Sequence, residues 1–264
     1  MSSAALIILI VVFLLSSIIG VVTGSNSLIA VPVMFEFGIE EKRAVATNMF
    51  GLVFMAVGGA IPFLRQGTVK VGELSPMIVL TVIGSAIGAA IVGLVSNESI
   101  KLIVTVGMIA VVIFTIVRPK NADVERAIAS ADELQERQTV FSGGSVFGYS
   151  VVFLLAIYGG LYSGGYVTVL TAVLVAFFGF SFGGSIAATK VINIFSSSVA
   201  TIVFIYQGLV DFKLGLILGV TMFIGGYFGA HFATKMNERV LRLIFYSAVF
   251  LLALKMLFDL FAGR

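Results

Sequence analysis

The chain has 264 residues, of which 59% are hydrophobic and only 11% are charged. Soluble domains carry about 25% charged residues, so this composition excludes a water-soluble fold and predicts an all-α polytopic membrane protein. The absence of cysteine excludes disulfides and thiolate metal sites, and the single His231 cannot build a multi-histidine metal site alone. The net charge of +3 is typical of positive-inside topology and does not indicate nucleic-acid binding.

Apolar segments of the first half predict five helices, at about 4–22, 27–37, 44–64, 74–95 and 100–117. The second segment is too short to cross a bilayer, which takes about 20 helical residues. It contains Pro32 and follows a glycine-bearing stretch that ends at Gly24, a pattern typical of discontinuous or re-entrant helices. Ser25, Asn26 and Ser27 all favour the N-cap position, so we expect this helix to begin there with free backbone N–H groups.

A polar linker at 118–144 separates the two halves of the chain. Its stretch 118–138 contains four basic and five acidic residues, with apolar positions at helical spacing. We expect a short amphipathic helix that lies on the membrane surface. The predicted organisation is therefore a first membrane repeat at 1–117, this linker, and a second membrane repeat at 145–264.

The second half predicts five further helices, at about 145–158, 166–178, 185–208, 212–231 and 240–261. These segments repeat the first half at an offset of 140–142 residues, since Ala46-Thr47 and Gln66-Gly67 recur as Ala188-Thr189 and Gln207-Gly208. Because each half has an odd number of segments, the second half should be upside down, which predicts two inverted repeats. Corresponding helices carry small residues that favour close packing, namely Gly84, Gly88, Gly225 and Gly229.

Basic residues are more frequent on one predicted side of the membrane, which we therefore assign to the cytoplasm. This side holds the central linker together with Arg65, Lys70, Lys235, Arg239 and Arg242. We expect a multi-pass protein of the cytoplasmic (inner) membrane whose uncharged N-terminus lies outside.

Motifs spread over essentially the whole chain carry a family resemblance. They are Gly20-Val-Val-Thr-Gly24, Arg43-Ala-Val-Ala-Thr-Asn48, Phe63-Leu-Arg-Gln-Gly67, Ala188-Thr189 and Gln207-Gly208-Leu-Val-Asp211. In their order, spacing and duplication they resemble the TauE/SafE family of sulfite and organosulfur anion exporters. The resemblance implies a transporter of sulfite, sulfonates or related oxyanions. The chain differs from the family pattern at Asn48, where a serine commonly stands, and at Lys190 in the second copy.

The candidate substrate site combines helix N-termini with one lysine. Two short helices begin near Ser25 and Gly165, and their N-termini supply N–H groups and a partial positive charge to an anion. Lys190 adds a full charge, at a cost of about 2.5–3.5 kcal/mol for a cation inside a spanning segment. Neutral donors, and glycines that let an anion approach the backbone, complete the predicted set: Asn26, Thr47, Asn48, Thr189, Asn193, Gly24 and Gly164.

Simpler interpretations remain open at several of these positions. Lys190 lies six residues beyond Gly184, so its side chain could instead extend to the membrane interface. Asn193 and the serines at 196–198 could hydrogen-bond neighbouring helices. The glycines at Gly24 and Gly164 could serve packing as well as substrate approach.

The predicted function is secondary export of a small sulfur-containing anion by alternating access. The sequence has no nucleotide-binding motif and no metal-ligand cluster, so we expect neither a cofactor nor enzymatic activity. A uniporter is an alternative, because an anion leaving a negative-inside cell is favoured by about 2.3 kcal/mol per charge per 100 mV; an anion channel is another. The expected partners are the small anion and the lipid bilayer but no nucleic acid, and the sequence leaves monomer and homodimer open.

Overall fold

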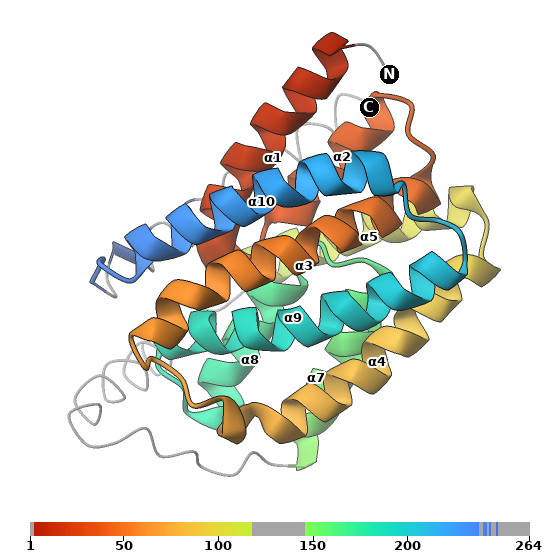
Figure 1. Ribbon diagram of the computed structural model, residues 1–264. Coiled ribbons are helices and arrows are strands. Elements are labelled where there is room, and N and C mark those ends of the chain that lie inside the picture. The colour runs from red at the N-terminus through yellow and green to blue at the C-terminus, as the bar shows by residue number, and fades with distance from the viewer. Residues whose placement is uncertain (1–2, 118–145, 238–239, 242, 244–246, 248–264) are drawn as a thin grey trace.

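The computed structural model describes residues 3–117 and 146–237, together with 240, 241, 243 and 247. The first half contains α1 (Ser3–Thr23), α2 (Asn26–Glu36), α3 (Glu41–Arg65), the short 3-10 helix η1 (Val71–Leu74), α4 (Ser75–Leu94) and α5 (Asn97–Val117). The second half contains α7 (Val146–Leu161), α8 (Tyr166–Phe178), α9 (Phe182–Tyr206) and α10 (Phe212–Ala233), as drawn in Figure 1. The predicted linker helix, and all but four residues of the predicted helix at 240–261, lie outside the described residues.

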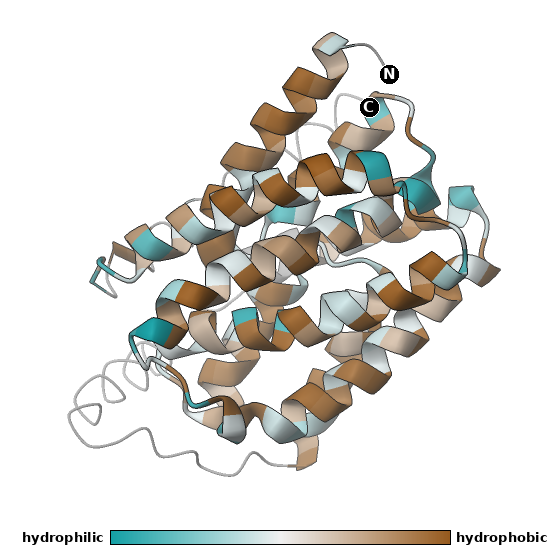
Figure 2. Ribbon diagram, viewed as in Figure 1, coloured by the Kyte–Doolittle hydropathy of each residue, from teal (hydrophilic) through white to brown (hydrophobic). Residues whose placement is uncertain are grey.

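The described helices confirm a polytopic helical membrane protein. Five of them are long and apolar enough to cross a bilayer, namely α1, α3, α4 with η1, α9 and α10. Large apolar side chains such as Leu15, Val79 and Leu216 are exposed on the outside of the bundle, where lipid takes the place of water. Figure 2 shows hydrophobic residues along the length of α1, whereas hydrophilic bands interrupt α9 within its length.

The two short helices predicted from the sequence are also present. Helix α2 has 11 residues and α8 has 13, so each is too short to span the hydrocarbon core, which takes about 20 residues. Each begins after a glycine with positive φ, 72° at Gly24 and 77° at Gly165. A residue with a side chain adopts this conformation only with strain, so glycine is required at both breaks.

The backbone repeats with one offset through both halves. Glycines with positive φ lie 141 residues apart in three pairs, which are Gly24 and Gly165, Gly38 and Gly179, and Gly67 and Gly208. Gly38 and Gly179 follow the C-terminal ends of α2 and α8. Gly67 and Gly208 follow the C-terminal ends of α3 and α9. The offset predicted from sequence motifs thus reappears in the turns of the fold.

The two halves are interlocked, because the fourth α-helix of each half packs on the other half. Helix α10 lies against α1 and α3, and α4 lies against α7 and α9. Glycines permit these crossings: a methyl group at Gly225 would lie 2.8 Å from the Leu14 carbonyl oxygen, and one at Gly84 would lie 3.0 Å from that of Phe153. The small residues on α4 and α10 therefore serve helix packing, as predicted.

Helices α3 and α9 also contact each other across the two halves, at the centre of the molecule. In Figure 1 they run in opposite directions, and so do α4 and α10. These courses are consistent with inverted repeats, which remain a prediction about the orientation of each half in the membrane.

Candidate functional site

The N-termini of the two short helices meet in the interior of the bundle. The Thr168 hydroxyl on α8 donates a hydrogen bond of 2.6 Å to the Thr23 carbonyl oxygen, which lies just before α2. The Tyr162 hydroxyl, just before α8, donates a bond of 3.0 Å to the Ser27 carbonyl oxygen on α2. A methyl group at Gly24 would lie only 2.6 Å from the Thr168 backbone nitrogen, so this glycine also permits the close approach of the two helices.

A cavity lies beside this meeting point, between the short helices and the central helices α3 and α9. Its polar and glycine lining comprises Gly20, Gly24, Asn26, Ser27, Ser163, Lys190 and Asn193. The cavity leaves about 10 Å³ for the centre of a water-sized sphere, which is room for about one water molecule. A polyatomic anion needs more space, so the site is nearly filled by protein atoms in this conformation.

Lys190 is the charged residue of this cavity. Its side chain is only 2% exposed and lines the cavity, so it does not extend to the membrane interface. Within the described residues no hydrogen bond and no ion pair involves its ammonium group, and no acidic residue lines the cavity. A methyl group at Gly59 on α3 would lie 3.5 Å from Lys190 Cδ, so the glycine makes room for the lysine stem. A buried cation without a counter-ion is costly and favours an anion as its partner.

Two buried asparagines stand close to the start of α2. Asn26 Nδ2 donates to the hydroxyls of Ser16 and Ser17 on α1, at 2.9 and 3.1 Å. Asn48 Nδ2 on α3 donates to the Ser27 hydroxyl at 2.9 Å. The Oδ1 atoms of both asparagines have no hydrogen-bond partner. Because serine hydroxyls both donate and accept, either amide can turn over and direct its NH₂ group elsewhere while keeping a bond to serine.

The structure brings some of the predicted site residues together. Gly24, Asn26, Lys190 and Asn193 line the cavity. Ser25 precedes α2, where its hydroxyl bonds the Thr23 hydroxyl at 2.6 Å. Asn48 reaches the cavity lining through its bond to Ser27. Glycines 164 and 165 shape the start of α8: a side chain at the former would collide with the ring of Tyr162, and the latter supplies the positive φ.

Two predicted residues lie elsewhere. The Thr189 hydroxyl donates to the Ile186 carbonyl oxygen of its own helix at 2.8 Å and does not line the cavity. The Thr47 hydroxyl accepts a bond of 3.1 Å from the Asp211 backbone N–H, at the start of α10. The Asp211 carboxylate in turn caps α10 by accepting from Leu214 N at 3.0 Å.

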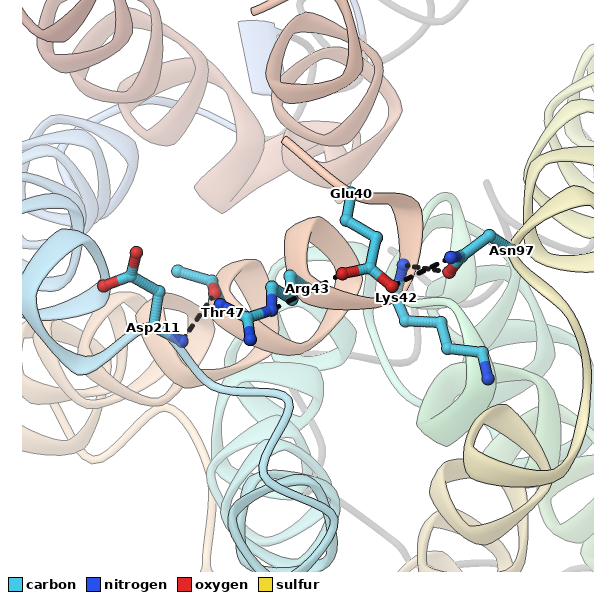
Figure 3. A network of polar contacts seen from close by, with 6 residues as sticks. All are labelled: Glu40, Lys42, Arg43, Thr47, Asn97 and Asp211. Atoms are coloured by element: carbon cyan, nitrogen blue, oxygen red, sulfur yellow. Dashed lines mark hydrogen bonds and ion pairs between the residues drawn. The ribbon is translucent and has the colours of Figure 1, made fainter. Parts of the chain in front are cut away.

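Thr47 belongs to a polar network at the ends of helices (Figure 3). In this network Arg43 pairs with Glu40 at 3.5 Å, and Asn97 donates to Glu40 at 2.8 Å. These exposed contacts connect the starts of α3, α5 and α10 and are structural. The distinction between Thr47 and its neighbour Asn48 follows from the rotation of α3, which sequence spacing alone does not reveal.

The cavity also contains residues that were not predicted as ligands. Ser163 lies directly before Gly164, and Ser27 was expected only to cap α2. Ser163 lies between α7 and α8 and Ser27 in the first turn of α2, so their proximity to predicted glycines was the available signal. Among the described residues there is no group of three or more His, Cys, Asp or Glu side chains that could hold a metal ion.

Comparison with known proteins agrees with this architecture. The family model described as "Sulfite exporter TauE/SafE" matches residues 8–256. The chain is 26% identical over 238 residues to "Probable membrane transporter protein ORF9" from Sinorhizobium sp, a match that covers 90% of this chain and 87% of the relative. It is 22% identical over 254 residues to a "Probable membrane transporter protein" of Haemophilus influenzae, covering 96% of this chain and 95% of the relative.

A third relative is "Probable membrane transporter protein YfcA" of Escherichia coli K12, which is 24% identical over 259 residues, with coverage of 96% of this chain and 89% of the relative. No solved structure gives a significant match. Because the family model covers nearly the entire chain, the protein is a multi-pass membrane transporter that belongs to the TauE/SafE sulfite exporter family.

Proposed function

We propose that the protein exports a small sulfur-containing anion, sulfite or an organosulfonate, across the cytoplasmic membrane. The observation that carries this proposal is the buried ammonium of Lys190, which lines a small cavity without a counter-ion among the described residues. The N-terminus of α2 faces the same cavity through Asn26 and Ser27 and adds the positive end of its helix dipole. These groups favour one small anion with several acceptor oxygens, because such an anion can accept hydrogen bonds from several sides at once.

The size of the cavity supports alternating access over an open channel. It has room for about one water, so the bundle must open to admit an anion and must close again around it. Uniport driven by the membrane potential and proton-coupled export both remain compatible with this cycle. Flux driven by an imposed potassium diffusion potential, compared with flux driven by an imposed pH gradient, distinguishes the two.

The packing indicates which helices move together during this cycle. Because α10 packs on α1 and α3, while α4 packs on α7 and α9, each moving body combines helices of both sequence halves. We expect α1, α3 and α10 to move as one body against α4, α7 and α9.

Spin labels on the cysteine-free chain test this assignment, since Leu15, Val79 and Leu216 are all exposed. The distance between labels at Leu15 and Leu216 should stay constant when anion is added, and that between Val79 and Leu216 should change. The alternative is that each sequence half moves as one body. In that case the distance between Leu15 and Val79 would stay constant and the distance between Leu15 and Leu216 would change.

Reconstitution tests the function itself. Purified protein in proteoliposomes should transport sulfite or an organosulfonate, and the same anion should raise its melting temperature, because a ligand that binds only the folded state stabilises it by mass action. Sulfite, thiosulfate, taurine and sulfoacetate are the anions to compare, with sulfate as an oxyanion of different shape. If no sulfur anion stabilises the protein and none is transported, the proposal is wrong.

A further inference from the structure

A second group of buried polar side chains lies next to the Lys190 cavity. Thr81 and Ser85 on α4, Tyr166 on α8 and Ser196 on α9 bring four hydroxyls together, and none of these residues is more than 1% exposed. The Ser85 and Ser196 hydroxyls lie 2.7 Å apart, and Ser85 Oγ also donates to the Ala156 carbonyl oxygen of α7 at 3.3 Å. We call these four residues the hydroxyl cluster.

Two of the four hydroxyls have no direct partner. The Tyr166 hydroxyl faces those of Thr81 and Ser196, but neither the Tyr166 nor the Thr81 oxygen completes a hydrogen bond. A buried hydroxyl without a partner costs about 1–3 kcal/mol, and two that face the same group of oxygens favour a shared polar occupant. A water molecule or an anion oxygen at this position would satisfy both.

The hydroxyl cluster continues the polar lining of the cavity. The Tyr166 backbone N–H donates to the carbonyl oxygen of Ser163, a cavity residue, at 3.2 Å. On α9, Asn193 lines the cavity and Ser196 follows it at the i, i+3 spacing, so the serine is the next-turn neighbour of a cavity residue. Ser197, whose hydroxyl donates to Asn193 Oδ1 at 3.3 Å, and Thr201, whose hydroxyl is unpartnered, extend this polar surface toward the C-terminal end of α9.

The surface equivalent by pseudo-symmetry is less polar. At the backbone offset of 141 residues, Thr81 and Ser196 correspond to Met222 and Met55, Ser85 corresponds to Gly226, and only Tyr166 has a polar counterpart, Ser25. Along α3, the counterparts of Asn193, Ser197 and Thr201 are Leu52, Ala56 and Ala60, respectively. Polar residues therefore extend the cavity along α9 and the hydroxyl cluster. At the equivalent positions of the other repeat, methionine, leucine and alanine replace most of them.

We propose that the hydroxyl cluster is a hydrated antechamber through which the transported anion passes between the Lys190 cavity and one side of the membrane. The inference rests on the proposed anion transport. The unpartnered hydroxyls of Thr81 and Tyr166 can each donate a hydrogen bond to an oxyanion that has left bulk water, and the cluster contains no carboxylate to repel it. The equivalent surface with Met222 and Met55 offers the anion no such hydroxyl donors. The anion route therefore differs in chemistry on the two sides of the Lys190 cavity.

Charge-selective labelling tests the route on the cysteine-free chain. Thr81→Cys places a thiol in the cluster, and Met222→Cys is the matched control, because both residues are 0% exposed and occupy equivalent positions. The probes are sulfonatoethyl methanethiosulfonate, which carries a sulfonate, and trimethylammonioethyl methanethiosulfonate, which is cationic. In proteoliposomes we expect the anionic reagent to label Thr81→Cys about tenfold faster than the cationic one, because Lys190 attracts the former and repels the latter. Met222→Cys should label slowly with both.

The antechamber proposal is wrong if the two cysteines are labelled at equal rates. It is also wrong if the cysteine at Thr81 stays unreactive while the same proteoliposomes transport anion. Labelling with the expected charge preference, in protein that moves no sulfur anion, would instead leave the route intact and reject the proposed function. The two failures are therefore distinguishable.

Tyr166→Phe separates a transport role from a structural one. It removes one unpartnered hydroxyl and keeps the ring that packs beside Gly159. An antechamber predicts a several-fold slower flux of anion with an unchanged or higher melting temperature. Unchanged flux in this variant, together with unchanged flux in Ser196→Ala, would assign the cluster to packing alone.

Discussion

Helices α3 and α9 have the same length and equivalent turns, but they present different chemistry to the centre of the protein. Each has 25 residues and is followed by a glycine with positive φ, Gly67 or Gly208. At the offset of 141 residues that the ends of the two helices share, Lys190 on α9 corresponds to Met49 on α3, whereas the Ala-Thr motif, at an offset of 142, pairs it with Asn48; all three residues are buried. The repeat thus preserves backbone shape and packing, while only one copy has a lysine at this buried position.

This comparison explains how a duplicated fold can hold a single anion. A strictly symmetric site would place two ammonium groups close together and would double the cost of burying charge. With one lysine, one short-helix N-terminus lined by Asn26, and an apolar wall from α3, the cavity carries a single positive charge. The predictions below alter or exchange the features in which the two halves differ or agree.

The largest effect is expected from Lys190→Met, which gives α9 the residue that α3 has at the equivalent position. Loss of a buried charge that contacts its ligand costs about 2–5 kcal/mol of binding, so anion affinity and flux should fall by about 30-fold or more. Insertion and expression should hold or improve, because methionine is less costly than lysine inside a membrane. Anion-dependent thermal shift and sulfite flux are the measurements.

Lys213→Met is the control for this variant, since Lys213 is exposed at the start of α10. It should leave affinity and flux unchanged. Lys190→Arg should recover part of the binding, because it retains the charge but replaces the compact ammonium by a planar group. Wild-type affinity in folded Lys190→Met protein would remove this lysine from the substrate site.

Met49→Lys, combined with Lys190→Met, transfers the lysine to the first half. Met49 is buried and does not line the cavity, so the new ammonium should lack an anion to contact and should cost about 2.5–3.5 kcal/mol on insertion. We expect poor expression and no recovery of transport, as measured by the yield of folded protein and by flux. Recovery of anion binding would show that the halves are functionally interchangeable, contrary to the comparison.

Gly225→Ala and Gly84→Ala test a feature in which the two halves agree. Each added methyl group meets the backbone of a crossing helix, so each variant should lose about 1–3 kcal/mol of stability through overpacking. Gly72→Ala is the matched control, because a methyl group there meets nothing within 4 Å. Melting temperatures in detergent provide the comparison, and equal values for all three variants would refute the close crossings of α10 with α1 and of α4 with α7.

The smallest effect is expected from Thr47→Val, which separates the structural network from the cavity. The variant loses the acceptor for the Asp211 backbone N–H, at a cost of about 0.5–1.5 kcal/mol. Anion affinity should stay the same, because Thr47 does not line the cavity. A variant that melts normally but binds anion weakly would place Thr47 in the substrate site after all.

The sequence by itself determined the membrane class, most helix boundaries and the repeat. Hydropathy and glycine position are local properties, so the helix predicted at 166–178 agrees with α8 (Tyr166–Phe178), and the one predicted at 27–37 agrees with α2 (Asn26–Glu36) within one residue at each end. The same local signals placed Gly24 and Gly165 in the turns before the two short helices, where positive φ makes glycine necessary.

Only the tertiary structure decided which polar residues share a cavity and which helices pack together. Asn48 and Thr47 are adjacent in sequence, but one bonds Ser27 beside the cavity and the other bonds Asp211 at a helix end. The crossing of α4 and α10 between the halves, and the meeting of Tyr166 with Thr81 and Ser196, likewise depend on long-range packing. In a chain where nearly every helix is apolar, hydrophobicity does not discriminate between neighbours. Small residues, the rotation of each helix and the partners of its few polar groups decide the arrangement, and these become visible only once the helices are packed.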